Sequence, residues 1–223
     1  MNKRIRAYDD KDKEARKKQI IEQALIIFNE TAYQNIKIEN IAKNTNIAKG
    51  TFFLYFKTKE SLFLEITTNE FENLFRIFKL NLENNFIPGQ KYYPEDFINF
   101  LKNSFSQYAD RKILFRLMSI TNVILEKNSD YKTVKAFKKM LYVNLINTGE
   151  KIEKVFNFVS RGGGNALLLN IYALIIGFQN ITDSSEIAKE VIENENLTLF
   201  NMNFEDLFFS ALKLLLLGIQ AVS

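Results

Sequence analysis

Apolar residues along most of this chain recur at the spacing of an amphipathic helix. In Lys13–Thr31 they lie three and four positions apart beside a polar face. The segments Ala166–Phe178 and Leu207–Ile219 are apolar on nearly every side, which requires burial on several faces. No stretch of useful length alternates apolar and polar residues as a strand does. The pattern therefore predicts an all-α fold.

Residues with special backbone or capping preferences divide this pattern into helices. Asn46 is expected at a sharp corner, because asparagine tolerates the left-handed conformation. Thr58 is expected to cap a long helix with its hydroxyl, and Pro94 suits the first turn of another. Arg161–Gly164 is the clearest break in the second half. The predicted helices are Lys13–Thr31, Ile38–Thr45, Ala48–Phe56, Thr58–Asn84, Pro94–Ala109, Arg111–Lys127, Asp130–Val159, Asn165–Asn180, Thr182–Asn194 and Asn203–Val222.

The composition argues against catalytic and metal chemistry. The 223 residues suit one or two domains, and they include no Cys and no His. The chain thus lacks the usual general base near neutral pH, the commonest metal ligand and any thiolate. We expect no catalytic residues, no metal, no cofactor and no enzymatic activity. There is no apolar leader and no run of about 18 apolar residues, so a cytoplasmic protein without a membrane span is predicted.

Positive charge is concentrated at the N-terminus. Residues 1–62 contain 13 Lys/Arg and 8 Asp/Glu, whereas residues 63–223 contain 17 and 18. A basic segment attached to a nearly neutral body indicates a polyanionic partner, although a solvated basic tail would look the same. We therefore predict a basic N-terminal arm with a helix-turn-helix domain over 1–62. A helical effector-binding and dimerisation domain is predicted over 63–223.

The two short predicted helices Ile38–Thr45 and Ala48–Phe56 are typical of a helix-turn-helix. One helix braces the DNA backbone, and the other presents its first residues to base edges in the major groove. Ala48–Thr51 offers small residues, a cation and a hydroxyl at that position. The side chains expected to hold the two helices together are Ile41, Ala42, Ile47, Phe52 and Phe56.

The segment Lys49–Leu62, which reads Lys-Gly-Thr-Phe-Phe-Leu-Tyr-Phe-Lys-Thr-Lys-Glu-Ser-Leu, resembles the recognition-helix signature of the tetracycline-repressor (TetR) family. The resemblance covers about residues 14–74. It implies a ligand-inducible repressor that binds a palindromic double-stranded operator as a homodimer. It also implies an all-helical C-terminal body that pairs two subunits and houses a pocket for a small-molecule effector.

Carried over position by position, the resemblance implies that Thr51, Tyr55 and Lys59 contact phosphates. It implies that Lys49, Gly50, Phe53 and Leu54 face the floor or the edges of the groove. Three residues depart from the family pattern. Lys37 stands where the family has a capping Thr or Ser, and it could instead reach a phosphate. Phe53 replaces a Tyr, and Leu54 stands where the family often has a polar or aromatic residue.

Phe53 and Leu54 suggest an unusually apolar reading surface that packs against thymine methyl groups and favours an A/T-rich operator. The alternative is that one of the two packs against the first helix. Further cations lie nearby. The residues Lys3, Arg4 and Arg6 form either a minor-groove arm or a solvated tail. Lys17 and Lys18 either touch flanking phosphates or belong to a solvated helix face.

Aromatic residues in the middle helices are candidates for an effector pocket that takes an apolar or aromatic ligand. They are Phe97, Phe100, Phe105, Tyr108, Phe115, Met118, Phe137, Met140, Tyr142 and Tyr172. A filled helical core is the alternative. The last two long helices are candidates for a four-helix dimer interface, as the family resemblance implies, with a monomeric core as the alternative. The interface candidates are Leu167, Ile171, Leu174, Phe178, Phe208, Leu212, Leu215 and Leu216.

Three functions are therefore to be compared. The helix-turn-helix directly supports a DNA-binding regulator. A helical protein-interaction module that keeps the helix-turn-helix as a scaffold is compatible with the charge distribution. A helical enzyme is disfavoured by the absence of His and Cys. The sequence does not identify the effector, the operator or the regulated genes, and it does not separate repression from activation.

Overall fold

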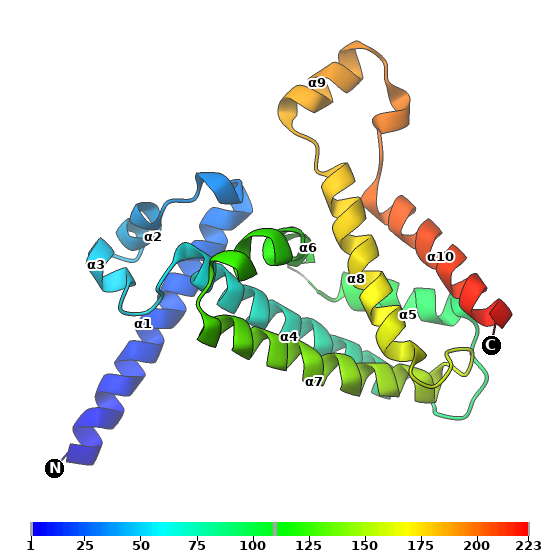
Figure 1. The fold of residues 1–223 in the computed structure, drawn as a ribbon, viewed down its shortest axis with the longest axis horizontal. Coiled ribbons are helices and arrows are strands. Elements are labelled where there is room, and N and C mark those ends of the chain that lie inside the picture. Colours follow the sequence, from blue (N-terminus) through cyan, green and yellow to red (C-terminus); the bar gives the residue numbers. More distant parts are fainter. Residues whose placement is uncertain (1, 109–110, 223) are drawn as a thin grey trace. The chain divides into compact units, whose positions relative to one another are not determined.

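A computed structural model of the chain is all-helical, which confirms the predicted fold class (Figure 1). It describes residues 2–108 and 111–222, with side chains over 12–108 and 111–221. The helices are α1 (Asn2–Glu30), α2 (Ile38–Asn44), α3 (Lys49–Phe52), α4 (Lys59–Asn85), α5 (Pro94–Ser106), α6 (Arg111–Ile120), α7 (Tyr131–Val155), α8 (Gly163–Thr182), α9 (Glu186–Asn194) and α10 (Phe204–Val222). Single turns of other helix types are η1 (Tyr33–Asn35), η2 (Thr121–Leu125), η3 (Glu126–Asn128) and η4 (Thr198–Phe200).

The predicted corner and cap residues act as expected. Asn46 adopts the left-handed conformation with φ 54° between α2 and α3. The Thr58 hydroxyl accepts a hydrogen bond from the Ser61 amide at 3.0 Å, which caps α4. The Asn203 side chain accepts one from the Glu205 amide at 2.8 Å and caps α10. These short polar side chains therefore fix where the helices begin.

The helix predicted over Ala48–Phe56 is shorter in the structure. Regular α-helix ends at Phe52, and the chain continues in single turns. The amide of Leu54 bonds the carbonyl of Thr51 at 3.1 Å, and that of Phe56 bonds Phe52 at 3.1 Å. The segment after Phe52 therefore still turns like a helix, but it lacks the continuous series of i to i−4 hydrogen bonds that defines an α-helix.

The helix predicted over Arg111–Lys127 is also interrupted. It is regular only as far as Ile120, passes through the wider π-helical turn η2 and ends in η3. Asp130 then starts α7, because its carboxylate accepts hydrogen bonds from the amides of Lys132 at 3.0 Å and Thr133 at 3.2 Å. Apolar spacing did not indicate this break, since a single widened turn leaves the periodicity nearly unchanged.

The chain forms two compact units. Unit 1 consists of Met1–Asn69 together with Thr121–Phe137, and unit 2 consists of Glu70–Ile120 together with Lys138–Ser223. The chain therefore passes between the units three times. Two of these passages lie within the continuous helices α4 and α7.

The core of unit 1 joins α1, α2 and α3 to the start of α4. The ring of Phe63 packs against Phe28 with centroids 5.4 Å apart, and edge-on against Tyr33 at 5.2 Å. Of the residues predicted to hold the helix-turn-helix together, four are buried and Ile47 is half-buried. The buried four are Ile41, Ala42, Phe52 and Phe56.

In unit 2, α8 packs against α6 and α10, and α10 packs against α5. Two glycines bring α7 and α8 into backbone contact. A Cβ added to Gly164 would lie 2.2 Å from the carbonyl oxygen of Gly149, and one added to Gly149 would lie 2.1 Å from the side chain of Asn165. Only glycine fits at these two positions, because any side chain would force the helices apart.

Helix α8 is longer than the apolar segment Ala166–Phe178 on which the absence of a membrane span was predicted. Its 20 residues have a mean hydropathy of 1.3 and would be long enough to cross a membrane. Leu167, Ile171 and Ile175 lie on the side of α8 that is buried against other helices of unit 2. Only 28% of its most apolar stretch is buried, so much of its apolar surface lies open.

Candidate DNA-binding interface and effector cavity

The tip of the helix-turn-helix presents the residues that the sequence assigns to the floor of the groove. Lys49 and Gly50 are exposed, and the side chains of Phe53 and Leu54 are 44% and 74% exposed. The ring of Phe53 rests edge-on against the buried ring of Phe52, with centroids 5.5 Å apart. Leu54 therefore does not pack against α1, whereas Phe53 keeps one aromatic contact within its own unit.

An ion pair links the two helices of the motif. The ammonium of Lys49, at the start of α3, lies 2.6 Å from a carboxylate oxygen of Glu39 in the first turn of α2. This hydrogen bond lowers the pKa of Glu39 below its usual value. At neutral pH the pair holds Lys49 in one position and places a negative charge beside the proposed DNA surface.

Gly50 has open space where a side chain would be. A Cβ built on it meets no atom within 4 Å. Packing inside this chain therefore does not require glycine here. Any requirement for the absence of a side chain would come from a partner that approaches the backbone closely, such as the edge of a base pair.

Thr51 and Tyr55, which the resemblance assigns to phosphates, are half-buried beside this tip. Their amides bond the carbonyls of Ala48 at 2.9 Å and Phe52 at 3.0 Å. The backbone that carries both hydroxyls is thus fixed. Their contact with DNA stays a prediction.

Lys59 is engaged within the protein. Its ammonium donates to the carbonyls of Tyr33 at 3.1 Å and Ile36 at 3.0 Å, and it lies 4.2 Å from the centre of the Tyr33 ring. Burial lowers the pKa of Lys59 below its usual value. The Tyr33 hydroxyl donates to Glu60 at 2.9 Å. This geometry favours a positioning role for Lys59, which ties the segment before α2 to the start of α4, over the direct phosphate contact that the resemblance implies.

Lys37 occupies the N-cap position of α2 and makes no side-chain capping bond, as expected for lysine. Its exposed ammonium can reach outward. Lys17 on α1 is paired with Glu65 at 2.5 Å, and Lys18 lies 3.8 Å from Glu22. The ammonium groups of both lysines on α1 therefore already lie beside a carboxylate.

The side chains of Lys3, Arg4 and Arg6 lie outside the described residues, so the choice between an arm and a tail is not addressed by the structure.

A strap formed by residues 121–137 is bonded to the beginning of α4. The Thr58 hydroxyl donates to the Asn128 carbonyl at 3.2 Å, and the Ser61 hydroxyl donates to Asp130 at 3.3 Å. Hydrogen bonding from Thr133 lowers the pKa of Asp130 below its usual value. The residues immediately after the helix-turn-helix are therefore held by a segment 70 positions later in the chain, a link that no sequence motif indicated.

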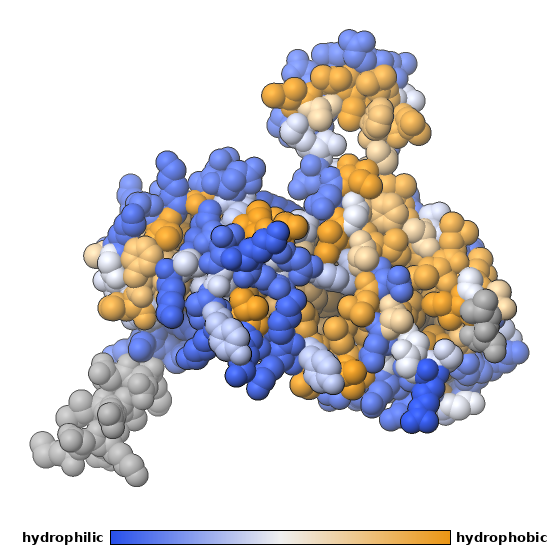
Figure 2. Space-filling view, in the orientation of Figure 1, coloured by the Kyte–Doolittle hydropathy of each residue, from blue (hydrophilic) through white to orange (hydrophobic). Residues whose placement is uncertain are grey.

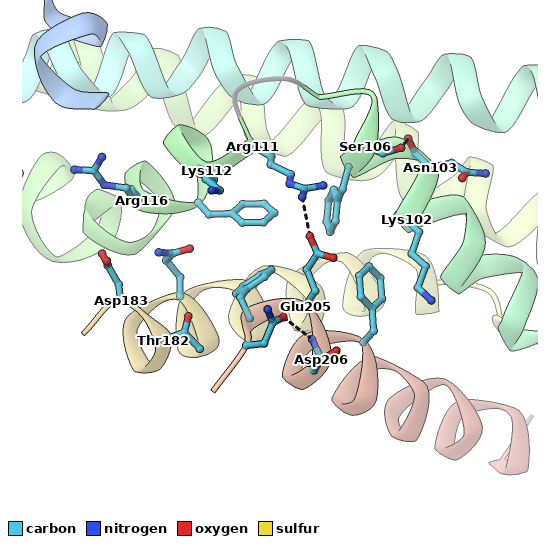
Figure 3. A pocket seen from close by; sticks show the side chains of 16 residues that line it. Lys102, Asn103, Ser106, Arg111, Lys112, Arg116, Thr182, Asp183, Glu205 and Asp206 are labelled. Carbon is cyan, nitrogen blue, oxygen red and sulfur yellow. Dashed lines mark hydrogen bonds and ion pairs between the residues drawn. The ribbon is translucent and has the colours of Figure 1, made fainter. Parts of the chain in front are cut away.

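Unit 2 contains an open cavity of about 1060 Å³ lined by α5, α6, α8 and α10 (Figure 3). Arg111 on one side is paired with Glu205 on the other at 2.7 Å, and the Lys102 ammonium lies 5.1 Å from the Phe209 ring. The four aromatic rings in its wall are Phe105, Phe115, Phe204 and Phe209, and its four cations are Lys102, Arg111, Lys112 and Arg116. Three carboxylates, those of Asp183, Glu205 and Asp206, also line the cavity, so its charged groups leave a small net positive charge beside the apolar wall. Such a lining is compatible with a ligand that has an apolar part and an anionic part.

Of the residues predicted to form an effector pocket, only Phe105 and Phe115 line this cavity. Five others are buried in the helical core, which was the alternative: Phe97, Phe100, Tyr108, Met118 and Phe137. Met140 and Tyr172 are half-buried, and Tyr142 is 69% exposed on α7. The predicted set is thus not brought together. The cavity cations were missed because they lie on different helices and form no motif.

The predicted dimer-interface residues differ in how far they are already covered within one subunit. Five of them, Leu167, Ile171, Phe208, Leu212 and Leu216, are already covered within one subunit. A covered side chain has almost no surface left to lose to a partner. Leu174, Phe178 and Leu215 are half-buried. The exposed apolar positions on the same two helices are instead Leu169, Ile181, Leu214 and Leu217.

Comparison with known proteins identifies the chain. The model of the N-terminal domain of bacterial regulatory proteins of the tetR family matches residues 20–66. The model of a tetracyclin repressor-like C-terminal domain matches residues 87–223, which is more than half of the chain. This chain belongs to the TetR family. TetR proteins are helix-turn-helix transcriptional regulators rather than enzymes, so the resemblance seen in the sequence is confirmed.

The curated relatives match only a short part of the chain, about the length of the helix-turn-helix domain. We call this domain the reading head. The uncharacterized HTH-type transcriptional regulator YuxN of Bacillus subtilis is 38% identical over 60 residues, which cover 27% of this chain and 21% of that protein. YhgD of the same organism is 43% identical over 53 residues, or 24% and 28% of the two chains. Its fatty acid metabolism regulator protein is 36% identical over 56 residues, or 25% and 29%. The matches thus span less than a third of each relative.

Solved TetR structures share the fold over most of the chain. The regulator FadR of Bacillus subtilis in complex with stearoyl-CoA has a TM-score of 0.52 at 16% identity, over 89% of this chain and 96% of that one. FadR of Thermus thermophilus, a TetR repressor in complex with lauroyl-CoA, has a TM-score of 0.50 at 19% identity, over 82% and 93%. At these identities the likeness concerns the fold alone.

Proposed function

We propose that this TetR protein is a homodimeric repressor that binds a palindromic operator and is released from it by a small amphiphilic anion. One observation carries the DNA-binding part of the proposal. The exposed tip of the helix-turn-helix combines a cation, a glycine with open space around it and two apolar side chains on a backbone held by turn hydrogen bonds. Such a tip suits the floor of a major groove. Binding to chromosomal DNA would place the protein in the cytoplasm.

The reading residues are Lys49, Gly50, Phe53 and Leu54, with Thr51, Tyr55 and Lys37 on phosphates. The 74% exposure of Leu54 supports a contact with thymine methyl groups and hence an A/T-rich half-site. Homodimers present two such tips about 34–36 Å apart, one helical turn of DNA, which is why the operator would be palindromic.

The effector class is argued from the cavity. Its four rings offer a wall for an acyl chain. Its four cations outnumber its three carboxylates by one, and Lys112 is proposed as a partner for the carboxylate or phosphate of the ligand because Arg111 is already paired with Glu205. The Bacillus and Thermus FadR proteins were solved with acyl-CoA, a ligand that has both parts. Acyl-CoA is therefore the first ligand class to test. The earlier expectation of a purely apolar or aromatic effector is extended by an anionic group.

Chain continuity offers a route from effector to DNA. Helix α6 contributes Arg111, Lys112 and Arg116 to the cavity and continues directly into η2 and η3. The residues that follow, Asn128 and Asp130, bond the start of α4. An effector that favours a different position of α6 would shift the population of reading heads away from the spacing that DNA requires.

Selection of binding sites from random duplex DNA, followed by fluorescence anisotropy, tests the DNA-binding part. We expect a palindromic, A/T-rich consensus whose affinity falls steeply with salt, because phosphate contacts release counterions. Leu54→Ala should change the selected half-site, whereas Ile26→Ala, at an exposed apolar position of α1, should not. A consensus dominated by G·C, or binding without sequence preference, would contradict the proposal.

The effector part is tested on the selected operator with lauroyl-CoA, lauric acid and free CoA at equal concentrations. We expect lauroyl-CoA to release the DNA at the lowest concentration, because it carries both the acyl chain and several phosphates, lauric acid to act more weakly, and free CoA, which lacks the chain, to have no effect. Lys112→Ala combined with Arg116→Ala should raise the concentration needed, whereas Lys91→Ala, outside the cavity, should leave it unchanged. Failure of all three compounds to bind or to release DNA would rule out this ligand class.

A further inference from the structure

Residues 183–203, which we call the arm, leave the end of α8, form α9 and η4 and return to α10. Figure 1 shows the arm extending away from the other helices of its unit. None of its residues is buried. Ile187 is 75% exposed, and Leu199 is 82% exposed. The arm therefore has no core of its own.

The apolar side chains of the arm are arranged in two rows. Ile192, Phe200 and Met202 line a small hollow inside the arm and hold α9 against η4. Ile187 and Val191, four positions apart on α9, share a second row that faces solvent. Leu197 and Leu199 are exposed as well. Contacts within the inner row account for how α9 and η4 are held together. No contact within the arm accounts for the apolar side chains of the outer row.

Helix α9 is too short to persist by itself. It has nine residues, and isolated helices below about 12–15 residues are marginal in water. The Ser185 hydroxyl caps it and one ion pair, between Lys189 and Glu186, lies on its surface. Such surface contacts add little. We therefore expect a partner surface to cover the exposed apolar row and to stabilise the arm.

Charge indicates what that partner is. The arm carries five carboxylates and one lysine, a formal charge of −4, whereas the rest of unit 2 contains 13 Lys/Arg and 10 Asp/Glu. The rest of unit 2 thus has a net charge of +3, opposite in sign to the arm, and a second copy of the chain would supply this charge. An acidic nucleic acid or an anionic membrane would instead repel the arm.

Apolar side chains are also exposed on the helices expected to pair. Figure 2 shows apolar side chains over the arm and along α8 and α10. Ile181 at the end of α8 is 51% exposed, and Leu214 and Leu217 of α10 are 70% and 46% exposed. Exposed apolar side chains thus occur both on the helix pair and on the protruding arm, on either side of a polar neck that includes Asp183 and Asn203. Exposed apolar patches of this kind are typical of an interface between two chains.

We propose that the arm of one subunit docks on a second copy of this chain, with Ile187, Val191 and Leu199 against the partner's exposed apolar surface and the acids toward its cations. The inference rests on the homodimer of the proposed function and adds a contact surface to it. Each subunit would clasp the other, so the arm would contribute to the stability of the dimer twice.

Because the chain has no cysteine, Ile187→Cys gives a single attachment point for an environment-sensitive thiol-reactive fluorophore. We expect its emission to shift to the blue as the protein concentration is raised through the dimer dissociation constant, which sedimentation measures in parallel. The matched control is Ile87→Cys, 60% exposed elsewhere in unit 2, whose emission should not change.

A second experiment does not depend on the label. Ile187→Ser combined with Leu199→Ser removes exposed apolar groups only, so folding should be retained, as circular dichroism would verify. We expect the dimer dissociation constant to rise by about tenfold or more, as for central interface residues, with no change for Ile87→Ser.

A dimer whose Ile187 label stays in water, or whose dissociation constant ignores the double substitution, would overturn the docked arm and leave the homodimer standing. A chain that stays monomeric at every concentration would overturn both. A label already shielded in the monomer would show that the arm folds back on its own subunit, which also contradicts docking.

Discussion

Lys49 at the start of the recognition turn and Glu39 in the preceding helix form an ion pair of 2.6 Å. The carboxylate restrains the cation that is closest to the proposed groove contact, and it opposes the approach of phosphates. The free protein thus keeps part of its DNA-binding charge neutralised. The proposed contact of Lys49 with DNA would exchange Glu39 for a base edge or a phosphate as the partner of Lys49.

Glu39→Gln should therefore strengthen binding to DNA of any sequence severalfold. Loss of the carboxylate frees Lys49 and removes a repulsive charge, so the slope of log affinity against log salt should become steeper by about one unit. Fluorescence anisotropy over a salt series measures both effects. Glu95→Gln, at an exposed position of α5 in unit 2, is the control and should change neither. Weaker binding would mean that the pair positions Lys49 for a specific contact.

Gly50→Ala should separate stability from binding. The substitution meets no atom within 4 Å, and alanine favours a helical turn by about 0.5–1 kcal/mol over glycine, so the free energy of unfolding should rise slightly. Affinity for the selected operator should fall by about tenfold or more if the backbone approaches a base edge closely. Urea unfolding and anisotropy measure the two quantities. Unchanged affinity would place Gly50 away from the DNA.

Lys59→Ala should destabilise unit 1, because two carbonyls and an aromatic ring lose their cation. We expect a loss of about 1 kcal/mol in the free energy of unfolding, reduced by partial solvent exposure. Binding should weaken similarly for every DNA sequence. A pure phosphate contact would also weaken binding uniformly but would leave the unfolding midpoint unchanged, so denaturant unfolding separates the two roles.

Asp130→Ala should lower the free energy of unfolding by about 1 kcal/mol, since it removes the cap of α7 and the partner of Ser61. Asp130→Asn keeps a capping side chain and loses only the charge. The native state lowers the pKa of Asp130, so ionisation stabilises the fold above the ordinary carboxyl pKa and ceases to do so as the pH falls. The stability difference between wild type and Asp130→Asn should therefore shrink as the pH falls below the ordinary carboxyl pKa toward the lower folded-state pKa, which thermal melts from pH 7 to pH 3 would follow.

Much of the fold could be predicted because its signals are local. Asn46 marks a corner through its left-handed backbone and Thr58 marks a helix start through its hydroxyl, and both predicted roles are confirmed. The π-helical turn at Thr121–Leu125 gave no such signal, since it changes the spacing of apolar residues by a single position.

The site was harder to predict where it depends on tertiary packing. A helix that is apolar on all sides does not reveal which side faces its own core, so Leu167 and Phe208 were assigned to an interface although one subunit already covers them. The pair of Lys49 with Glu39 spans ten positions and two helices, and the pair of Arg111 with Glu205 spans 94. Neither spacing corresponds to a motif.

The strap over Thr121–Phe137 has a consequence for engineering. Exchanging only the first 69 residues for those of a relative would place foreign residues at positions 58 and 61 against the strap of this chain, so the hydrogen bonds to the Asn128 carbonyl and the Asp130 carboxylate would depend on what those residues are. A chimeric regulator with a new operator and the old effector should therefore be built by exchanging two separate stretches of the gene, the first ending near codon 69 and the second covering codons 121–137.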